Sequence, residues 1–185
     1  MRIIAGSFKN RSITAPKGVE TRPTSSKVRG ALFNICQNYI ENALFLDLFA
    51  GSGAMGIEAL SRGASKAIFI DDSSASCRCI QANLKALNLE ERGEVICRDA
   101  LTALKGLQRR NVQCDIVYID PPYQMFPVEN LLAPFRDSLL AADGILFLEE
   151  AAIDIPDSSF RGFEELSRRE YGKTVLYQLK KEVHQ

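Results

Sequence analysis

Short apolar segments rich in β-branched and aromatic residues alternate with amphipathic helical segments through the middle of this sequence. Five of them are expected as strands, at residues 44–49, 67–70, 94–97, 115–119 and 144–148. Apolar strands separated by helices form parallel sheets that are covered on both faces. The alternation therefore predicts an α/β fold in which ligands bind beyond the carboxyl ends of the strands.

The two ends of the chain depart from this alternation. Residues 2–8 and 11–14 predict a small hairpin, and a helix capped by Thr24 or Ser25 is expected to follow. Its expected apolar face consists of Val28, Leu32, Ile35 and Tyr39. Near the other end, residues 163–169 and 174–179 predict an antiparallel hairpin. We expect residues 1–40 to form an extension and residues 41–185 to form the main domain.

Composition excludes several classes of protein. With 185 residues, 46% apolar and 25% charged, the chain is expected to form one globular domain. No apolar run approaches the roughly 20 residues of a membrane span, and the opening residues do not resemble a signal peptide. The five scattered cysteines are expected to be reduced in a cytoplasmic protein. His184 is the only histidine, which argues against Ser-His-Asp hydrolases and histidine-rich metal sites, and we expect no metal.

Charge is distributed unevenly although the whole chain is neutral. Residues 1–30 contain seven Lys and Arg residues and one Glu, a net charge of +6, so the remaining residues carry −6. A basic segment on an acidic body suggests docking of a polyanion at one end. A solvated basic hairpin without a partner is an equally good interpretation of this feature alone.

A glycine-rich loop follows the first expected strand. Gly51-Ser52-Gly53-Ala54-Met55-Gly56 fits G-x-G-x-x-G between a strand and a helix, where glycines let the backbone approach a nucleotide. Asp71 lies twenty residues after Gly51, at the end of the next strand, where a carboxylate can bind ribose hydroxyls. A tight glycine turn without a ligand is the weaker interpretation because the acidic partner is present.

Both NAD and S-adenosylmethionine are bound by such loops. Asp47 lies inside the strand, four residues before Gly51, and suits the cationic amino group and sulfonium of S-adenosylmethionine better than a pyrophosphate. Asp99, at the end of the third strand, can accept a hydrogen bond from the adenine amine. It can also cap the helix that follows, and the two roles do not exclude each other.

Asp120-Pro121-Pro122-Tyr123 ends the fourth strand and is the most informative tetrapeptide. Prolines remove backbone donors and leave carbonyl acceptors. The Asp120 carboxylate and the Pro121 carbonyl can therefore accept both hydrogens of an exocyclic amine and orient it toward an electrophile. Tyr123 can stack on an extruded base. A strand-terminating turn with an edge tyrosine is the alternative interpretation, and it leaves the strand-end carboxylates unexplained.

Beyond these motifs, the chain resembles the bacterial small-subunit ribosomal RNA guanine-N2 methyltransferases, the RsmD family. The most specific match is Arg22-Pro23-Thr24 with Val28-Arg29 and the segment Ala31–Asn34. The resemblance implies a class I methyltransferase fold, a doubly wound, Rossmann-like, seven-stranded and mostly parallel sheet with a C-terminal antiparallel hairpin and a small N-terminal hairpin-and-helix extension. It also implies S-adenosylmethionine as methyl donor and a guanine of 16S ribosomal RNA, free or in an assembling subunit, as acceptor.

The resemblance also implies which residues form the site, by matching positions of this sequence to the family's motifs. The target base is expected at Asp120, Pro121, Pro122 and Tyr123. The cofactor is expected at Asp47, Phe49, Ala50, Gly51, Ser52, Gly53, Asp71, Asp72, Asp99 and Ala100. The RNA is expected at Arg2, Arg11, Arg22, Thr24 and Arg29. The sequence departs from the family where Asn10 replaces Gly, Gly30 replaces Glu and Asp71 replaces Glu.

The expected protein is thus a monomeric methyltransferase that modifies the N2 amine of a guanine. Three alternatives stay open. DNA adenine-N6 methylation could use the same Asp-Pro-Pro-Tyr, although the chain has no evident DNA-recognition domain. An NAD-dependent oxidoreductase could use the same glycine loop, although no proton relay is apparent. A non-catalytic RNA-binding assembly factor would leave the strand-end carboxylates without a purpose.

Overall fold

The structure, a computed structural model, describes residues 1–16, 26–122, 127–151 and 155–182. These residues form a seven-stranded sheet with strand order β3-β2-β1-β4-β5-β7-β6. The strands are β1 (Leu44–Leu48), β2 (Lys66–Asp71), β3 (Gly93–Cys97), β4 (Cys114–Ile119), β5 (Leu140–Ala151), β6 (Phe163–Tyr171) and β7 (Thr174–Lys181). Strands β1 to β5 run parallel, and β7 is antiparallel to both of its neighbours. The predicted doubly wound sheet with a C-terminal hairpin is confirmed.

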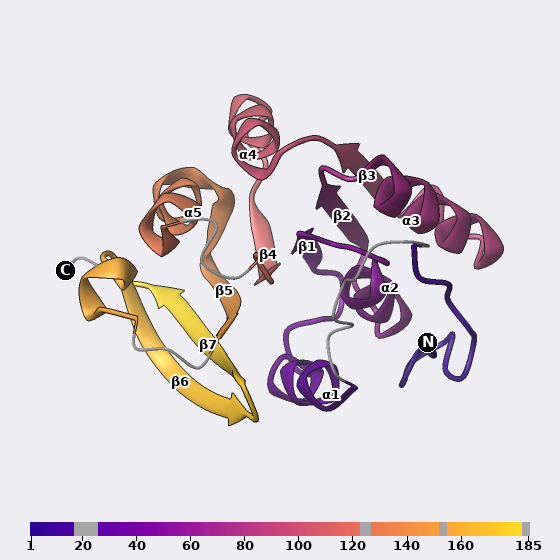
Figure 1. The fold of residues 1–185 in the computed structure, drawn as a ribbon, viewed down its shortest axis with the longest axis horizontal. Helices are drawn as coiled ribbons and strands as arrows, with labels where there is room; N and C mark the ends of the chain where they lie inside the picture. The colour runs from indigo at the N-terminus through magenta and orange to yellow at the C-terminus, as the bar shows by residue number, and fades with distance from the viewer. Residues whose placement is uncertain (17–25, 123–126, 152–154, 183–185) are drawn as a thin grey trace.

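Helices cover both faces of the sheet (Figure 1). One face carries α1 (Ser26–Ile35), α2 (Ala54–Ser61) and α3 (Ser74–Ala86). The other carries α4 (Ala100–Arg109) and α5 (Val128–Pro134), which a π-helical turn at Phe135–Leu139 extends. A short 3-10 turn spans Asp157–Phe160. None of the helices in the described ranges has the length and hydropathy needed to cross a membrane.

The sheet changes its winding direction between β1 and β4, and this point positions the site. Leu48 at the end of β1 is in register with Ile70 of β2 and with Ile119 of β4. The carboxyl ends of these three strands therefore lie at one level. In open α/β sheets the crevice for the ligand forms at such a switch point.

The N-terminal segment contains less regular secondary structure than the sequence predicts. In place of two hairpin strands there is a single antiparallel bridge between Arg2 and Ser12. The turn passes through Asn10 at φ 68°, a left-handed conformation that Gly and Asn tolerate best. This explains how Asn10 can replace the glycine of the family. Ile3 and Ile13 are buried in the same core cluster as α1 and α2, so this segment packs on the main domain.

The predicted apolar face of α1 is right in its first half and wrong at its end. Val28 and Leu32 are buried, whereas Tyr39 is 57% exposed because the helix ends at Ile35. Phe33, which the predicted face did not include, is buried and stacks on Phe45 of β1, with ring centroids 5.9 Å apart. The expected caps, Thr24 and Ser25, lie outside the described residues.

Candidate active site

The glycine loop leaves β1 through three left-handed residues. Phe49, Gly51 and Gly53 have φ values of 64°, 55° and 76°. Such a conformation costs a residue with a side chain about 1 kcal/mol or more, and strained backbone of this kind clusters at functional sites. The Ala50 N–H donates to the carbonyl of Ile70 on β2 (2.9 Å), which anchors the strained turn. The loop is thus held against the neighbouring strand.

Asp71 fixes the same loop from the end of β2. Its Oδ2 accepts the Gly51 N–H at 2.7 Å and its Oδ1 accepts the Ser73 N–H at 2.9 Å. Carboxylate oxygens have two lone pairs each, so Asp71 keeps the capacity to accept ribose hydroxyls. Open space adjoins the loop, because a Cβ on Gly51 would meet no atom within 4 Å. Asp71 lies at the end of β2 beside the glycine loop, as the sequence predicts, and its contact with a ribose remains a prediction.

Asp47 lies beneath the loop and is only 1% exposed. Its Oδ2 accepts the N–H of Gly56 in α2 at 2.9 Å. Burial raises the pKa of Asp47 to about 7, although the Gly56 hydrogen bond acts in the opposite direction. A cation at this position would stabilise the carboxylate. Asp47 therefore fits the amino group of S-adenosylmethionine, and its role in binding remains a prediction.

The remaining predicted cofactor residues differ in exposure. Asp99 is exposed and its side chain accepts the Thr102 N–H at 2.9 Å, so it is the N-cap of α4, as one of the two interpretations predicts. This hydrogen bond is the main reason that the pKa of Asp99 is lowered. Ala100 is buried in the first turn of α4, and Asp72 is exposed just beyond β2. Their contacts with a cofactor remain predictions.

The Asp-Pro-Pro segment lies next to the glycine loop. The Asp120 N–H donates to the carbonyl of Leu48, the last residue of β1, at 3.4 Å. Pro121 is buried and Pro122 is exposed. Tyr123 lies outside the described residues. The structure therefore brings Asp120 and the proposed cofactor loop together at the switch point, as the sequence predicts.

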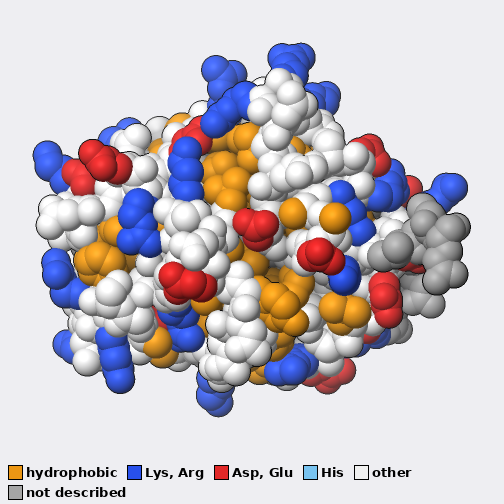
Figure 2. All heavy atoms as spheres, turned by 180° about the vertical axis from the view of Figure 1, so that it is seen from behind, with side chains coloured by type: hydrophobic (Ala, Val, Ile, Leu, Met, Phe, Trp, Pro, Cys, Tyr) orange, Lys and Arg blue, Asp and Glu red, His pale blue; other side chains and the backbone are white. Residues whose placement is uncertain are grey.

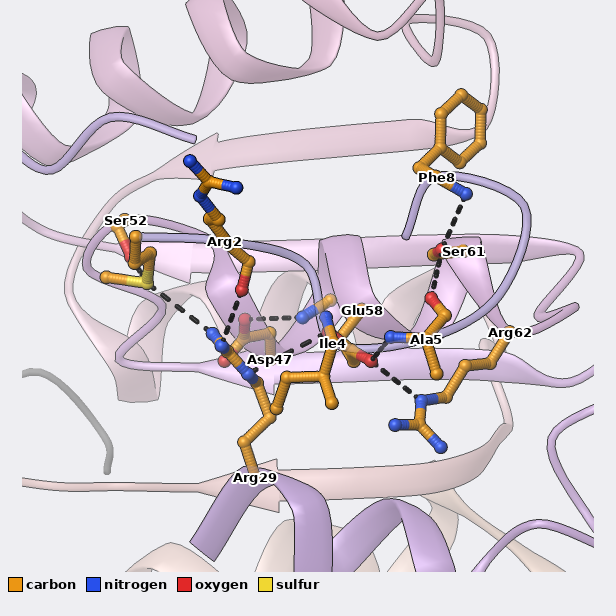
Figure 3. Close-up of polar contacts among 12 residues, drawn as sticks. Arg2, Ile4, Ala5, Phe8, Arg29, Asp47, Ser52, Glu58, Ser61 and Arg62 are labelled. Atoms are coloured by element: carbon orange, nitrogen blue, oxygen red, sulfur yellow. Dashed lines mark hydrogen bonds and ion pairs between the residues drawn. The ribbon is translucent and has the colours of Figure 1, made fainter. Parts of the chain in front are cut away.

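Glu58 of α2 is a buried carboxylate that sequence reasoning missed (Figure 3). It accepts the backbone N–H groups of Ile4 (2.8 Å) and Ala5 (3.0 Å). It also pairs with Arg62 at 2.8 Å and lies 3.8 Å from the Arg29 guanidinium. The sequence does contain a signal for this burial, because Glu58 is the one charged residue in a segment, residues 54–61, of otherwise apolar or small residues. Glu58 holds the N-terminal segment against the helix that follows the glycine loop.

The expectation that Arg29 contacts RNA is corrected by the structure. Arg29 is 3% exposed, and its guanidinium donates inward to the carbonyl of Arg2 (2.8 Å) and contacts the sulfur of Met1. Burial lowers the pKa of Arg29, while Glu58 opposes this shift. An inward guanidinium of this kind cannot reach a phosphate backbone. We therefore assign Arg29 to the packing of the N-terminal segment.

Asn83 of α3 provides a second link that was not expected. Its Nδ2 donates to the carbonyls of Ser52 (3.1 Å) and Thr14 (3.0 Å), and its Oδ1 accepts the Thr14 N–H (2.9 Å). The sequence marked Asn83 only as part of the family resemblance. Its amide joins the glycine loop to the N-terminal segment.

The other predicted RNA contacts are less constrained. Arg2 and Arg11 are exposed, and Arg11 donates to the carbonyl of Ala86 at the end of α3 (3.0 Å). Arg22 and Thr24 lie outside the described residues. Figure 2 shows a face on which Lys and Arg side chains are scattered both within the face and along its outline, with acidic side chains between them. Within the described ranges, no group of three His, Cys, Asp or Glu side chains is arranged to hold a metal ion.

Comparisons with known proteins identify the family. The family model described as "Conserved hypothetical protein 95" matches residues 1–180. Ribosomal RNA small subunit methyltransferase D of Escherichia coli is 31% identical over 179 residues, which cover 97% of this chain and 88% of that protein. The chain belongs to the ribosomal RNA small subunit methyltransferase D family.

Two further relatives agree with this membership. "Putative rRNA methyltransferase YlbH" of Bacillus subtilis is 37% identical over 184 residues, 98% of this chain and 99% of that protein. The solved structure of "Putative methyltransferase yhhF from Escherichia coli" superposes with a TM-score of 0.84 at 28% identity and covers 100% of this chain and 99% of that one. Members of the methyltransferase D family are named as methyltransferases, so this chain is an S-adenosylmethionine-dependent methyltransferase and the oxidoreductase alternative is excluded.

Proposed function

We propose that this member of the methyltransferase D family methylates the exocyclic N2 amine of a guanine in small-subunit ribosomal RNA. The observation that carries the proposal is the hydrogen bond from Asp120 to Leu48, because it puts the Asp-Pro-Pro segment directly beside the glycine loop. Bound S-adenosylmethionine supplies an electrophilic methyl group on a sulfonium. The chain then needs only to hold an amine in line with that group.

Asp120 and Pro121 supply the acceptors for this task. The Asp120 carboxylate and the Pro121 carbonyl accept one amine hydrogen each, which fixes the direction of the nitrogen lone pair. Asp71 holds the ribose and the glycine loop, and Asp47 holds the amino group of the cofactor. Tyr123 stacks on the extruded base and offsets part of the few kcal/mol needed to unstack it. The amine proton leaves after methyl transfer, so no strong base is assigned.

The N-terminal extension, residues 1–40, is proposed to dock the RNA on the domain of residues 41–185. Exposed Arg2 and Arg11 support this, and Arg22 and Thr24 complete the expected set. Phosphate contacts of this kind orient a protein on RNA without reading its sequence. We expect the enzyme to act as a monomer in the cytoplasm and without a metal ion, since a sulfonium is already a good leaving group.

The test is methyl transfer from labelled S-adenosylmethionine to small-subunit particles that lack the modification, followed by nucleoside mass spectrometry. Label in N2-methylguanosine supports the proposal. Label at adenine in duplex DNA, with none in the particles, would replace the acceptor and keep the cofactor site.

A variant separates catalysis from RNA binding. Asp120→Ala removes one acceptor for the amine and is expected to abolish methyl transfer while particle binding persists. Parallel loss of both would instead support a non-catalytic binding role for this segment. Asp115→Ala, an exposed residue at the opposite end of β4, is the matched control and is expected to retain activity.

A further inference from the structure

Asn83 of α3 is a buried amide, 4% exposed, that the proposed mechanism does not use. Its Oδ1 accepts the N–H and the hydroxyl of Thr14, each at 2.9 Å. Its Nδ2 donates to the carbonyls of Thr14 (3.0 Å) and Ser52 (3.1 Å). An amide oxygen accepts two hydrogen bonds and an amide nitrogen donates two. Asn83 therefore uses its full capacity to join the N-terminal segment to the glycine loop.

The hydrogen bond from Asn83 fixes the peptide group between Ser52 and Gly53. The carbonyl end of this group accepts from Asn83, and its N–H end, which belongs to Gly53, donates to the carbonyl of Ala50 at 2.7 Å. A peptide group is planar, so hydrogen bonds at both ends fix its orientation. Gly53 has a φ of 76° and does not hold this orientation by itself, because glycine populates both signs of φ about equally. The shape of the glycine loop therefore depends on Asn83.

Thr14 determines which way the Asn83 amide points. Two donors of Thr14 face Oδ1, so Nδ2 faces the two carbonyls. Exchange of the amide oxygen and nitrogen would set donors against donors and acceptors against acceptors. Thr14 belongs to the N-terminal segment, which passes beside α3 (Figure 1) and to which the proposed function assigns RNA docking. The donor that holds the glycine loop is thus oriented by a residue of that segment.

The glycine loop also packs closely on α3 and contacts the first residue of the chain. A Cβ on Gly53 would lie 3.1 Å from Ile80 of α3, and the Ser52 hydroxyl lies 3.8 Å from the sulfur of Met1. Residues three apart on a helix lie on the same side of it, so Ile80 and Asn83 face the loop together. This side of α3 therefore supports the loop by packing as well as by a hydrogen bond.

We propose that Asn83 is a positioning residue of the cofactor site, which holds the glycine loop in the shape that binds S-adenosylmethionine and is itself oriented by Thr14. The N-terminal segment then contributes to cofactor affinity in addition to its proposed contact with RNA. The affinity of a protein falls in proportion to the fraction of its molecules in the binding-competent conformation. Loss of the Asn83 bond lowers this fraction. The proposal rests on the proposed function in one respect, which is that the glycine loop holds the cofactor.

The test measures the Kd of S-adenosylhomocysteine, the demethylated cofactor, by isothermal titration calorimetry of the full chain. Asn83→Asp keeps the size of the side chain and its acceptor for Thr14, but it sets a carboxylate oxygen against the carbonyl of Ser52. We expect Kd to rise by at least about tenfold. Simple loss of folded protein would instead lower the number of sites titrated per chain and leave the Kd of the folded fraction unchanged.

Kinetics on small-subunit particles separate positioning from catalysis. In Asn83→Asp the KM for S-adenosylmethionine is expected to rise by about tenfold, whereas kcat at saturating cofactor stays within about threefold of the wild type, because bound cofactor selects the competent loop. Thr14→Val changes an exposed residue and removes only the hydroxyl bond to Asn83, so we expect Kd to rise by about fivefold. This second variant keeps the proposal testable if Asn83→Asp does not fold.

Gln81→Glu is the matched control, because it makes the same change from amide to carboxylate on an exposed position of α3, and its Kd is expected to equal that of the wild type. A folded Asn83→Asp with the wild-type Kd overturns the role of Asn83, and an unchanged Kd in Thr14→Val overturns that of Thr14. Asp71→Ala tests the proposed function separately. If it binds cofactor as well as the wild type, the cofactor does not lie at the glycine loop and this proposal falls with that placement.

Discussion

Replacement of Glu58 by Gln tests whether the N-terminal segment is held by a buried charge. Gln keeps the size of the side chain but removes the negative charge beside Arg29, which is 3% exposed. It also weakens the hydrogen bonds from Ile4 and Ala5. Removal of one partner of a buried ion pair costs about 3–5 kcal/mol because the other charge stays buried. We expect the free energy of unfolding to fall by about 4 kcal/mol.

The assay is equilibrium unfolding in urea, with thermal unfolding beside it. For a chain of this length the loss corresponds to a decrease in Tm of about 8–16 °C. Glu94→Gln is the control, because Glu94 pairs with Arg110 (2.6 Å) and Lys66 (3.2 Å) at the surface. Such exposed pairs contribute about 1 kcal/mol or less. If Glu58→Gln costs no more than Glu94→Gln, the attribution of N-terminal docking to Glu58 is wrong.

Three further predictions concern Asp47 of β1, Gly56 of α2 and Gly30 of α1. Because burial raises the pKa of Asp47 to about 7, the folded chain without cofactor binds a proton that the unfolded chain lacks between about pH 4 and pH 7. Its Tm should therefore fall as pH rises through this window, and Asp47→Asn should flatten the profile. Gly56→Ala should destabilise by about 1–3 kcal/mol in urea unfolding, since the new Cβ would lie 2.2 Å from the Phe69 ring. Gly30→Ala should stabilise by up to about 1 kcal/mol in the same assay, because a Cβ there meets no atom within 4 Å; a loss would contradict this.

The site at the switch point is predictable from the sequence because it follows from local patterns. Apolar strands indicate where the sheet lies, and a residue just past each strand must lie at its carboxyl edge. Asp71 and Asp120 can therefore be assigned to one edge from the order of the strands alone. Asp47 can be assigned to the strand that leads into the glycine loop. It therefore lies near the start of the helix after that loop, where it accepts the Gly56 N–H.

The errors share a different physical cause, which is that burial of a charged residue depends on a distant partner. The sequence predicts that Arg29 is exposed like the other cations of this segment, because its partner Glu58 lies on another helix. The Glu58 and Arg62 pair, four residues apart, is typical of a surface pair on a helix, yet α2 is buried along its whole length. Tyr39 is misplaced because an apolar period does not show where a helix ends. Such facts depend on tertiary contacts that the sequence pattern does not contain.

The docking of the N-terminal segment also orders events during synthesis of the chain. Ile4 bonds to Glu58 across 54 positions, and Thr14 bonds to Asn83 across 69 positions. At about 5–20 residues per second, translation needs roughly 3–14 s to add the partners of this segment. Its positively charged residues leave the ribosome before the residues of α2 and α3 that bind this segment. The segment can therefore reach its folded position only after α2 and α3 have been made.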